Sequence, residues 1–171
     1  MNILRFLRPA CIKLHLDFHP AEPLPDESEA TTAARHRREK EVLIAELASI
    51  LNQSGDIANL SKLTKDLSHR ERKATTAIGP GIAIPHVRSY QAKHFIIGLA
   101  RADQPGIDFD SLDGEPTRLF ILLASPPYDD RTYLQVYREF AHLVRDEDSL
   151  AGLYAAETEQ DVFNTLRTFF R

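Results

Sequence analysis

One stretch decides the fold of this chain: Arg70-Glu-Arg-Lys-Ala-Thr-Thr-Ala-Ile-Gly-Pro-Gly-Ile-Ala-Ile-Pro-His-Val-Arg88. It contains a Gly-Pro-Gly turn and then a very short apolar strand that leads directly to His86. Pro85 disfavours the helical region for Ile84, so the backbone stays extended up to the histidine. The stretch therefore predicts an imidazole on a proline-stiffened corner immediately after a buried strand, and such rigidly held corners often carry reactive groups.

The residue types at this corner suit phosphate chemistry. An ordinary imidazole has a pKa of ~6.5, so at neutral pH most of it is an uncharged nucleophile. Arg88 lies two residues after His86, on the same side of an extended chain. Its guanidinium could hold phosphate oxygens through two hydrogen bonds. From spacing alone, a corner histidine beside a surface arginine is the competing interpretation.

Two helices are predicted before this stretch. The charged run 35–41 leads into a helix that ends near Gly55, and Asn59 is a plausible cap for the second helix. The apolar faces of the two helices carry Leu43, Leu47, Ile50, Leu60, Leu63 and Leu67. The segment 20–34, which has three prolines and no apolar periodicity, is predicted to be a flexible insertion.

The remaining pattern alternates strands with helices. Residues 12–17 alternate apolar and polar side chains, and 94–100 and 118–124 are apolar runs of strand length. A helix is predicted from near Arg131, and a last one from Thr158 with a capping-box pattern. This order indicates an α/β class, with a central mixed β-sheet flanked by helices.

Composition limits the class of protein further. The 171 residues, 43% hydrophobic and 27% charged, fit one globular domain over 1–171. The net charge of −4 disfavours nucleic acid as a partner. No apolar stretch is long enough for stable membrane insertion, and Arg5 and Arg8 interrupt the first one, so a cytoplasmic location is expected. No spacing of ligands suggests a metal, and no cofactor is expected.

The stretch from Arg70 to Arg88 resembles the active-site signature of the mannitol/fructose-type enzyme IIA domain of the phosphoenolpyruvate-dependent sugar phosphotransferase system. That family includes the nitrogen-regulatory IIA proteins. Its pattern runs Arg-Glu, Ser/Thr-Thr, Gly-Ile-Gly-x-Gly and Ala-Ile-Pro-His. The chain carries Arg70-Glu71, Thr75-Thr76, Ala77-Ile78-Gly79, Gly81 and Ala83-Ile84-Pro85-His86 in register. Similarity continues through Pro105-Gly-Ile-Asp-Phe and Leu112-Asp-Gly-Glu-Pro, and implies an α/β fold.

The resemblance implies a role for each residue of the site. His86 would take a phosphoryl group from an HPr-like phosphocarrier and pass it to a IIB domain, or use it as a signal to a regulated target. Arg70 would lie near the phosphoryl oxygens, with a structural arginine at the helix end as the alternative. Thr76 would either donate a hydrogen bond to the phosphoryl group or satisfy the turn. An active protein would be a phosphotransferase component with a phosphohistidine intermediate.

One departure from the family pattern concerns charge. Tyr133 stands where the family usually has a second active-site histidine. A tyrosine can donate a hydrogen bond to a phosphate oxygen or to the ring of His86, but it cannot supply a positive charge. His142 lies nine residues further on, more than two helical turns away, and is not expected to substitute. Three hypotheses follow: a phosphoryl relay, a regulatory module whose binding depends on phosphorylation of His86, or a degenerate homologue without turnover.

Overall fold

The computed structural model describes residues 1–171, and a five-stranded mixed sheet forms its centre. The strands run in the order β1-β4-β5-β2, with β3 also paired to β5. Strand β4 is antiparallel to β5, whereas β2 and β3 run parallel to β5 and β1 runs parallel to β4. Their bounds are β1 Leu7–Lys13, β2 Ile82–Ala83, β3 His86–Arg88, β4 Ile96–Arg101 and β5 Leu119–Ser125. The expected mixed sheet is confirmed.

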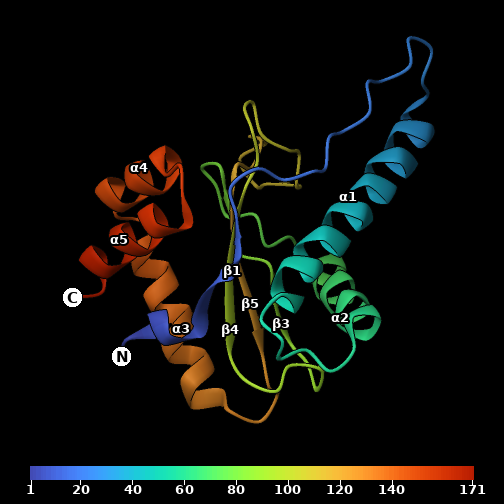
Figure 1. Ribbon diagram of the computed structural model, residues 1–171. Helices are drawn as coiled ribbons and strands as arrows, with labels where there is room; N and C mark the ends of the chain where they lie inside the picture. The colour runs from blue at the N-terminus through green and yellow to red at the C-terminus, as the bar shows by residue number, and fades with distance from the viewer.

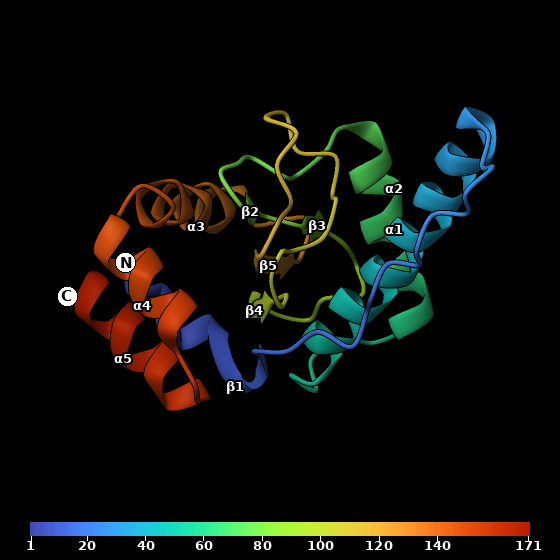
Figure 2. The ribbon, with the colours of Figure 1, turned by 90° about the horizontal axis from the view of Figure 1, so that it is seen from above.

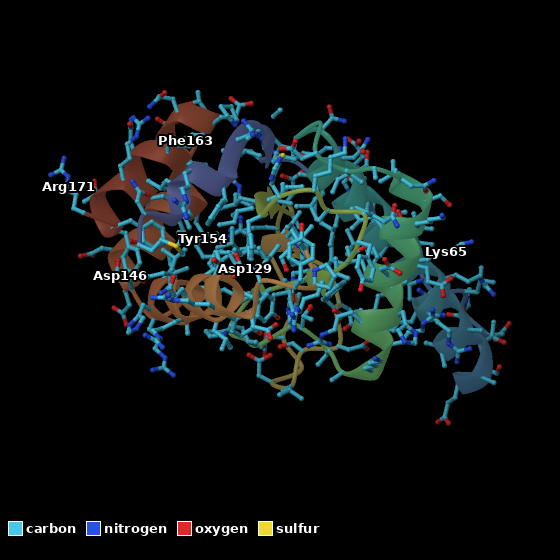
Figure 3. The ribbon with its side chains drawn as sticks, turned by 90° about the horizontal axis from the view of Figure 1, so that it is seen from below. Lys65, Asp129, Asp146, Tyr154, Phe163 and Arg171 are labelled. Atoms are coloured by element: carbon cyan, nitrogen blue, oxygen red, sulfur yellow. The ribbon has the colours of Figure 1, made fainter.

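Helices cover both faces of the sheet, as Figure 1 shows. Helices α1 and α2 lie on one side, and α3, α4 and α5 lie on the other (Figures 1 and 2). In Figure 3, Lys65 on α2 and Phe163 on α5 mark these two sides. The helix bounds are α1 Glu29–Asn52, α2 Leu60–Lys73, α3 Asp130–Leu143, α4 Glu147–Ala155 and α5 Glu159–Phe169, with a 3-10 turn at Ile3–Phe6.

The two central strands explain why the sheet needs two covering layers. Every residue of β4 and β5 is buried, because their apolar side chains point to both faces. One hydrophobic core joins β5 to α1 and α2 through residues such as Phe120, and a second joins it to α3 and α5 through residues such as Ile121. The two apolar runs predicted as strands are confirmed, with bounds shifted by one or two residues.

Local capping fixes where the helices begin. Asn59 accepts a hydrogen bond from the Lys62 amide at the start of α2, and Thr158 and Asp161 form the expected capping box of α5. Ser28 caps α1 in the same way, so this helix begins at Glu29. Residues 29–34 are therefore helical, and the prediction of a flexible insertion over all of 20–34 is wrong for that part.

One further prediction is wrong, and one helix is missing from the predictions. The first strand lies at Leu7–Lys13 and not at 12–17. It contains Pro9, which has no amide hydrogen, and this is tolerated because β1 is an edge strand paired only with β4. Helix α4 was not anticipated from the sequence at all.

None of the helices is both long enough and apolar enough to cross a bilayer.

Candidate functional site

His86 is the first residue of β3, and β5 holds it in position. Its register partner on β5 is Leu123, and the short strand β2 and Pro85 bring the chain to that point. The residue is only 6% exposed, yet it lines a cavity of about 400 Å³. The cavity is bounded by one face of α2, by β3 and by the beginning of α3. The side chain is therefore fixed by the sheet and reaches a concave surface.

The hydrogen bonds of the ring define which nitrogen is available. Nδ1 lies 2.7 Å from the carbonyl oxygen of Ile84, and a carbonyl can only accept, so Nδ1 carries the proton. Nε2 then has a lone pair, which accepts a hydrogen bond from Nε of Arg70 at 3.2 Å. Burial lowers the pKa of His86 below its ordinary value, and the positive charge of Arg70 lowers it further, against the Ile84 hydrogen bond and Glu71. The ring is thus a neutral nucleophile at Nε2.

Arg70 combines the two roles that the sequence left open. It lies in the last turn of α2, where Nη1 donates to the carbonyl of Ala74, the residue that caps the helix, at 2.9 Å. Its Nε reaches the ring of His86 at the same time. The guanidinium is therefore anchored at the helix end and points into the cavity.

Arg88 lines the same cavity, but its guanidinium is already engaged. Nη2 donates to the carbonyl of Pro127 and to the carboxylate of Asp130. The guanidinium also lies over the ring of Tyr133, 5.3 Å from its centroid. Of the two predicted arginines, Arg70 contacts His86 and Arg88 ties β3 to the start of α3.

A pair of tyrosines from α3 completes the wall around the imidazole. The ring centroid of Tyr133 lies 6.4 Å from that of His86, and that of Tyr137 lies 5.1 Å from it, edge to face. The two tyrosines stack on each other one helical turn apart. Burial raises the pKa of both phenols, so both remain neutral. Sequence reasoning missed Tyr137, although its spacing of four residues from Tyr133 was a usable signal.

Thr76 does not face the cavity. It is buried, and its hydroxyl donates to the carboxylate of Glu71 at 2.6 Å, while its amide donates to the same carboxylate at 2.9 Å. Lys40 Nζ lies 3.2 Å from the carboxylate oxygen that accepts the Thr76 amide hydrogen bond. The hydroxyl of Thr76 thus satisfies the turn before β2, and its candidacy as a phosphoryl ligand is not supported.

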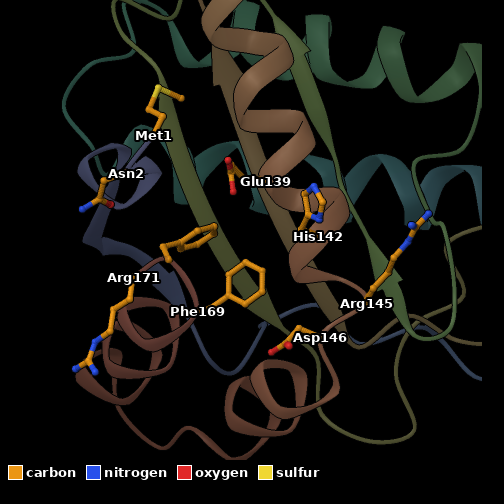
Figure 4. A pocket seen from close by; sticks show the side chains of 9 residues that line it. Met1, Asn2, Glu139, His142, Arg145, Asp146, Phe169 and Arg171 are labelled. Carbon is orange, nitrogen blue, oxygen red and sulfur yellow. The ribbon is translucent and has the colours of Figure 1, made fainter.

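Two other polar groups lie away from His86. His142 lines a separate cavity near both chain ends, beside Met1 and Arg171, as Figure 4 shows. Potential metal-ligand atoms of three other residues lie within 4.8 Å of one another, on His36, Asp108 and Asp110. The spacing of these residues in the sequence did not reveal this grouping. Lys40 already supplies a cation to Asp110, with Nζ at 2.7 Å.

The fold and the site together define a single-domain α/β protein with a neutral, oriented histidine beside a guanidinium. The family model described as "Phosphoenolpyruvate-dependent sugar phosphotransferase system, EIIA 2" matches residues 27–168, and the chain belongs to this family. The resemblance noted in the sequence is thereby confirmed.

Several relatives and solved structures are similar to this chain. A nitrogen regulatory protein of Bradyrhizobium diazoefficiens is 37% identical over 100 residues, which is 58% of this chain and 65% of that protein. A fructose-specific EIIA component of Haloferax volcanii is 30% identical, over 74% of this chain and 82% of its own length. The chain spans only 20% of the fructose-specific EIIABC component of Bacillus subtilis, to which it is 29% identical over 75% of its own length.

The solved structures agree on the fold. Nitrogen regulatory protein IIA-Ntr from Neisseria meningitidis superposes with a TM-score of 0.76 at 21% identity, covering 97% of this chain and 99% of that one. IIA mannitol from Escherichia coli gives a TM-score of 0.62 at 19% identity, covering 92% and 96%.

Proposed function

We propose that this chain is a phosphoryl carrier, in which Nε2 of His86 accepts a phosphoryl group from an HPr-like phosphocarrier. The group would then pass to a IIB domain or act as a signal to a regulated target. The observation that carries the proposal is the Nδ1–H hydrogen bond to Ile84, which leaves Nε2 as the nucleophile on the cavity side. Family membership and the IIA relatives support it, and we place the activity in the cytoplasm.

The transfer step is an in-line displacement between two ring nitrogens. The lone pair of His86 Nε2 forms a bond to phosphorus as the bond from phosphorus to the donor imidazole breaks, and the donor ring keeps that electron pair. Such a step requires mainly positioning and stabilisation of the negatively charged phosphoryl oxygens. Nδ1–H remains bonded to Ile84 throughout, so the acceptor ring keeps its orientation.

Arg70 has to exchange one acceptor for another during the step. Its Nε now occupies the lone pair of His86, which the phosphoryl group must take. The guanidinium would turn to the phosphoryl oxygens while its bond to Ala74 keeps it at the cavity. Hydrogen bonds to charged groups contribute about 1.5–3 kcal/mol.

A regulatory role is the second candidate, and the residue at position 133 favours it. The tyrosine there is neutral, so it offers no cation to the phosphoryl group during transfer, and slow turnover would suit a signal. A phosphorylated histidine adds roughly two negative charges to the cavity, which is enough to alter recognition by a partner. The nitrogen regulatory relative at 37% identity agrees with this candidate.

The test mixes the protein with phosphoenolpyruvate, enzyme I and HPr, and measures intact mass. We expect a gain of one phosphoryl group that His86→Gln abolishes and the matched control His142→Gln retains. Absence of the gain with several carriers would contradict the proposal and indicate a degenerate homologue. A chase of the phosphorylated protein with IIB domains then separates relay from regulation.

A further inference from the structure

The outer face of α2 carries a stripe of basic side chains, formed by Lys62, Lys65, His69 and Lys73. The spacings of three and four residues place all four on one face of the helix. All four are exposed, and the ion pairs of this region involve Lys40 and Arg72 instead. Figure 3 shows Lys65 on α2 at the edge of the molecule. The stripe stands out because the whole chain carries a net charge of −4.

Helix stability does not account for the excess of positive charge on this face. Lys62 lies in the first turn, which contains no acidic residue, and a cation there opposes the helix dipole. Lys65 has Ser61 and His69 four residues away on either side, so no acid neutralises it along the helix. Asp66 lies on the same face, four residues after Lys62, and lines the cavity, where its carboxylate accepts a hydrogen bond from Ser89 Oγ at 2.6 Å. The three lysines outnumber this one acid, and none of them forms an ion pair, so the face keeps an excess of positive charge.

The stripe leads into the cavity of His86. His69 and Lys73 line that cavity together with His86 and Arg70. Lys62 and Lys65 extend the same face toward the beginning of α2, away from the cavity. A protein whose phosphorylated residue entered the cavity would therefore lie across this face of the helix.

We propose that this stripe is a docking surface for an acidic patch on the protein that exchanges a phosphoryl group with His86. The inference rests on the proposed function and names the chemistry of its partner. Opposite charges at the edge of an interface steer association and fix orientation. A protein partner is favoured over nucleic acid because the stripe is confined to one helix of a chain with net negative charge.

The first test measures docking without phosphoryl transfer. Hexaglutamate is titrated into the protein, and amide chemical shifts are followed by NMR. The affinity for hexaglutamate should fall about tenfold in Lys62→Glu/Lys65→Glu. In the wild-type protein we expect chemical-shift changes along α2. They should persist in His86→Gln and in the control Arg38→Glu/Arg145→Glu, which changes the net charge equally. Tighter binding of a short DNA duplex to the same face than of hexaglutamate would overturn the inference, as would shifts unaffected by the lysine changes.

The second test measures phosphorylation of His86 by phospho-HPr in the same variants. The rate constant should fall about tenfold in the lysine variant at ~0.05 M salt and little at ~0.5 M, where charges are screened. Equal rates and equal salt dependence in the lysine and arginine variants would overturn the docking surface. Peptide binding without any phosphorylation of the wild-type protein would instead remove the proposed function and leave the basic surface supported.

Discussion

Replacing Tyr133 by histidine tests whether a missing positive charge limits transfer. The ring at this position lies 6.4 Å from the ring of His86, centroid to centroid. Two unit charges at that separation interact by about 2–3 kcal/mol at an effective dielectric constant of ~20. Water in the open cavity reduces this to about 1–2 kcal/mol, which corresponds to a rate gain of about five- to thirtyfold.

The dependence on pH distinguishes charge from shape in Tyr133→His. An ordinary imidazole is about three-quarters protonated at pH 6 and only about 3% at pH 8. The guanidinium of Arg88, which lies 5.3 Å from the ring centroid, reduces the charged fraction of an imidazole there until the phosphoryl group arrives. Burial lowers the pKa of His86, so more of the acceptor is neutral at pH 6 than for an ordinary imidazole. The gain should therefore be large at pH 6 and nearly absent at pH 8.

Quenched-flow phosphorylation by phospho-HPr measures this gain, with Tyr133→Gln as the neutral control. The control should show no acceleration at either pH. Equal acceleration of Tyr133→His at both pH values, or none at pH 6, would refute the account of the missing charge.

Three further predictions concern stability, each measured by urea unfolding. Because burial lowers the pKa of His86, the unfolded chain binds a proton that the folded chain does not; the free energy of unfolding should fall below about pH 6.5. His86→Gln should lose that part of the slope, and identical slopes would contradict the argument. Glu71→Leu leaves the buried amide and hydroxyl of Thr76 without their acceptor, while Lys40 keeps its ion pair with Asp110, and should cost about 2–4 kcal/mol, against about 1–3 for Thr76→Val; a loss below ~1 kcal/mol in the former would refute the network. In Gly152→Ala the new methyl group would meet Thr165 at 2.8 Å, which should cost about 1–3 kcal/mol; failure of Thr165→Ala to recover part of this would count against the contact.

The features predicted well from the sequence are those with short-range causes. Asn59 and Thr158 mark helix starts through hydrogen bonds that span three residues, so the signal is complete in the local sequence. The two central strands are also readable, because burial on both faces requires continuous apolar runs.

The features missed depend on contacts between distant segments. Helix α4 is short and contains Gly152, which lowers its helical propensity; the glycine is needed because Thr165 of α5 lies against it. Strand β1 contains Pro9, which is compatible only with an edge position that the chain order does not reveal.

The sequence identified several residues of the site, but not how they lie relative to one another. His86 and Arg70 were both named, but their contact depends on how α2 packs against β3, and the resemblance alone supplied that pairing. Tyr137 lies four residues after Tyr133, but only the packing of α3 brings it to the imidazole. Thr76 looked chemically suitable, yet the buried carboxylate of Glu71 takes its hydroxyl.

The contact between Arg70 and His86 bears on why a carrier can release what it accepts. A site that gained a large binding energy for the phosphoryl group would trap it, since only differences between states drive a step forward. Here Arg70 already donates to Nε2, so acceptance of a phosphoryl group would replace one hydrogen bond of the guanidinium by another and would bring no new cation to the site. The bond from Arg70 to Ala74 keeps the guanidinium within reach in both states. The preset guanidinium would therefore keep the proposed phosphohistidine close in energy to the free protein and its donor, as reversible transfer requires.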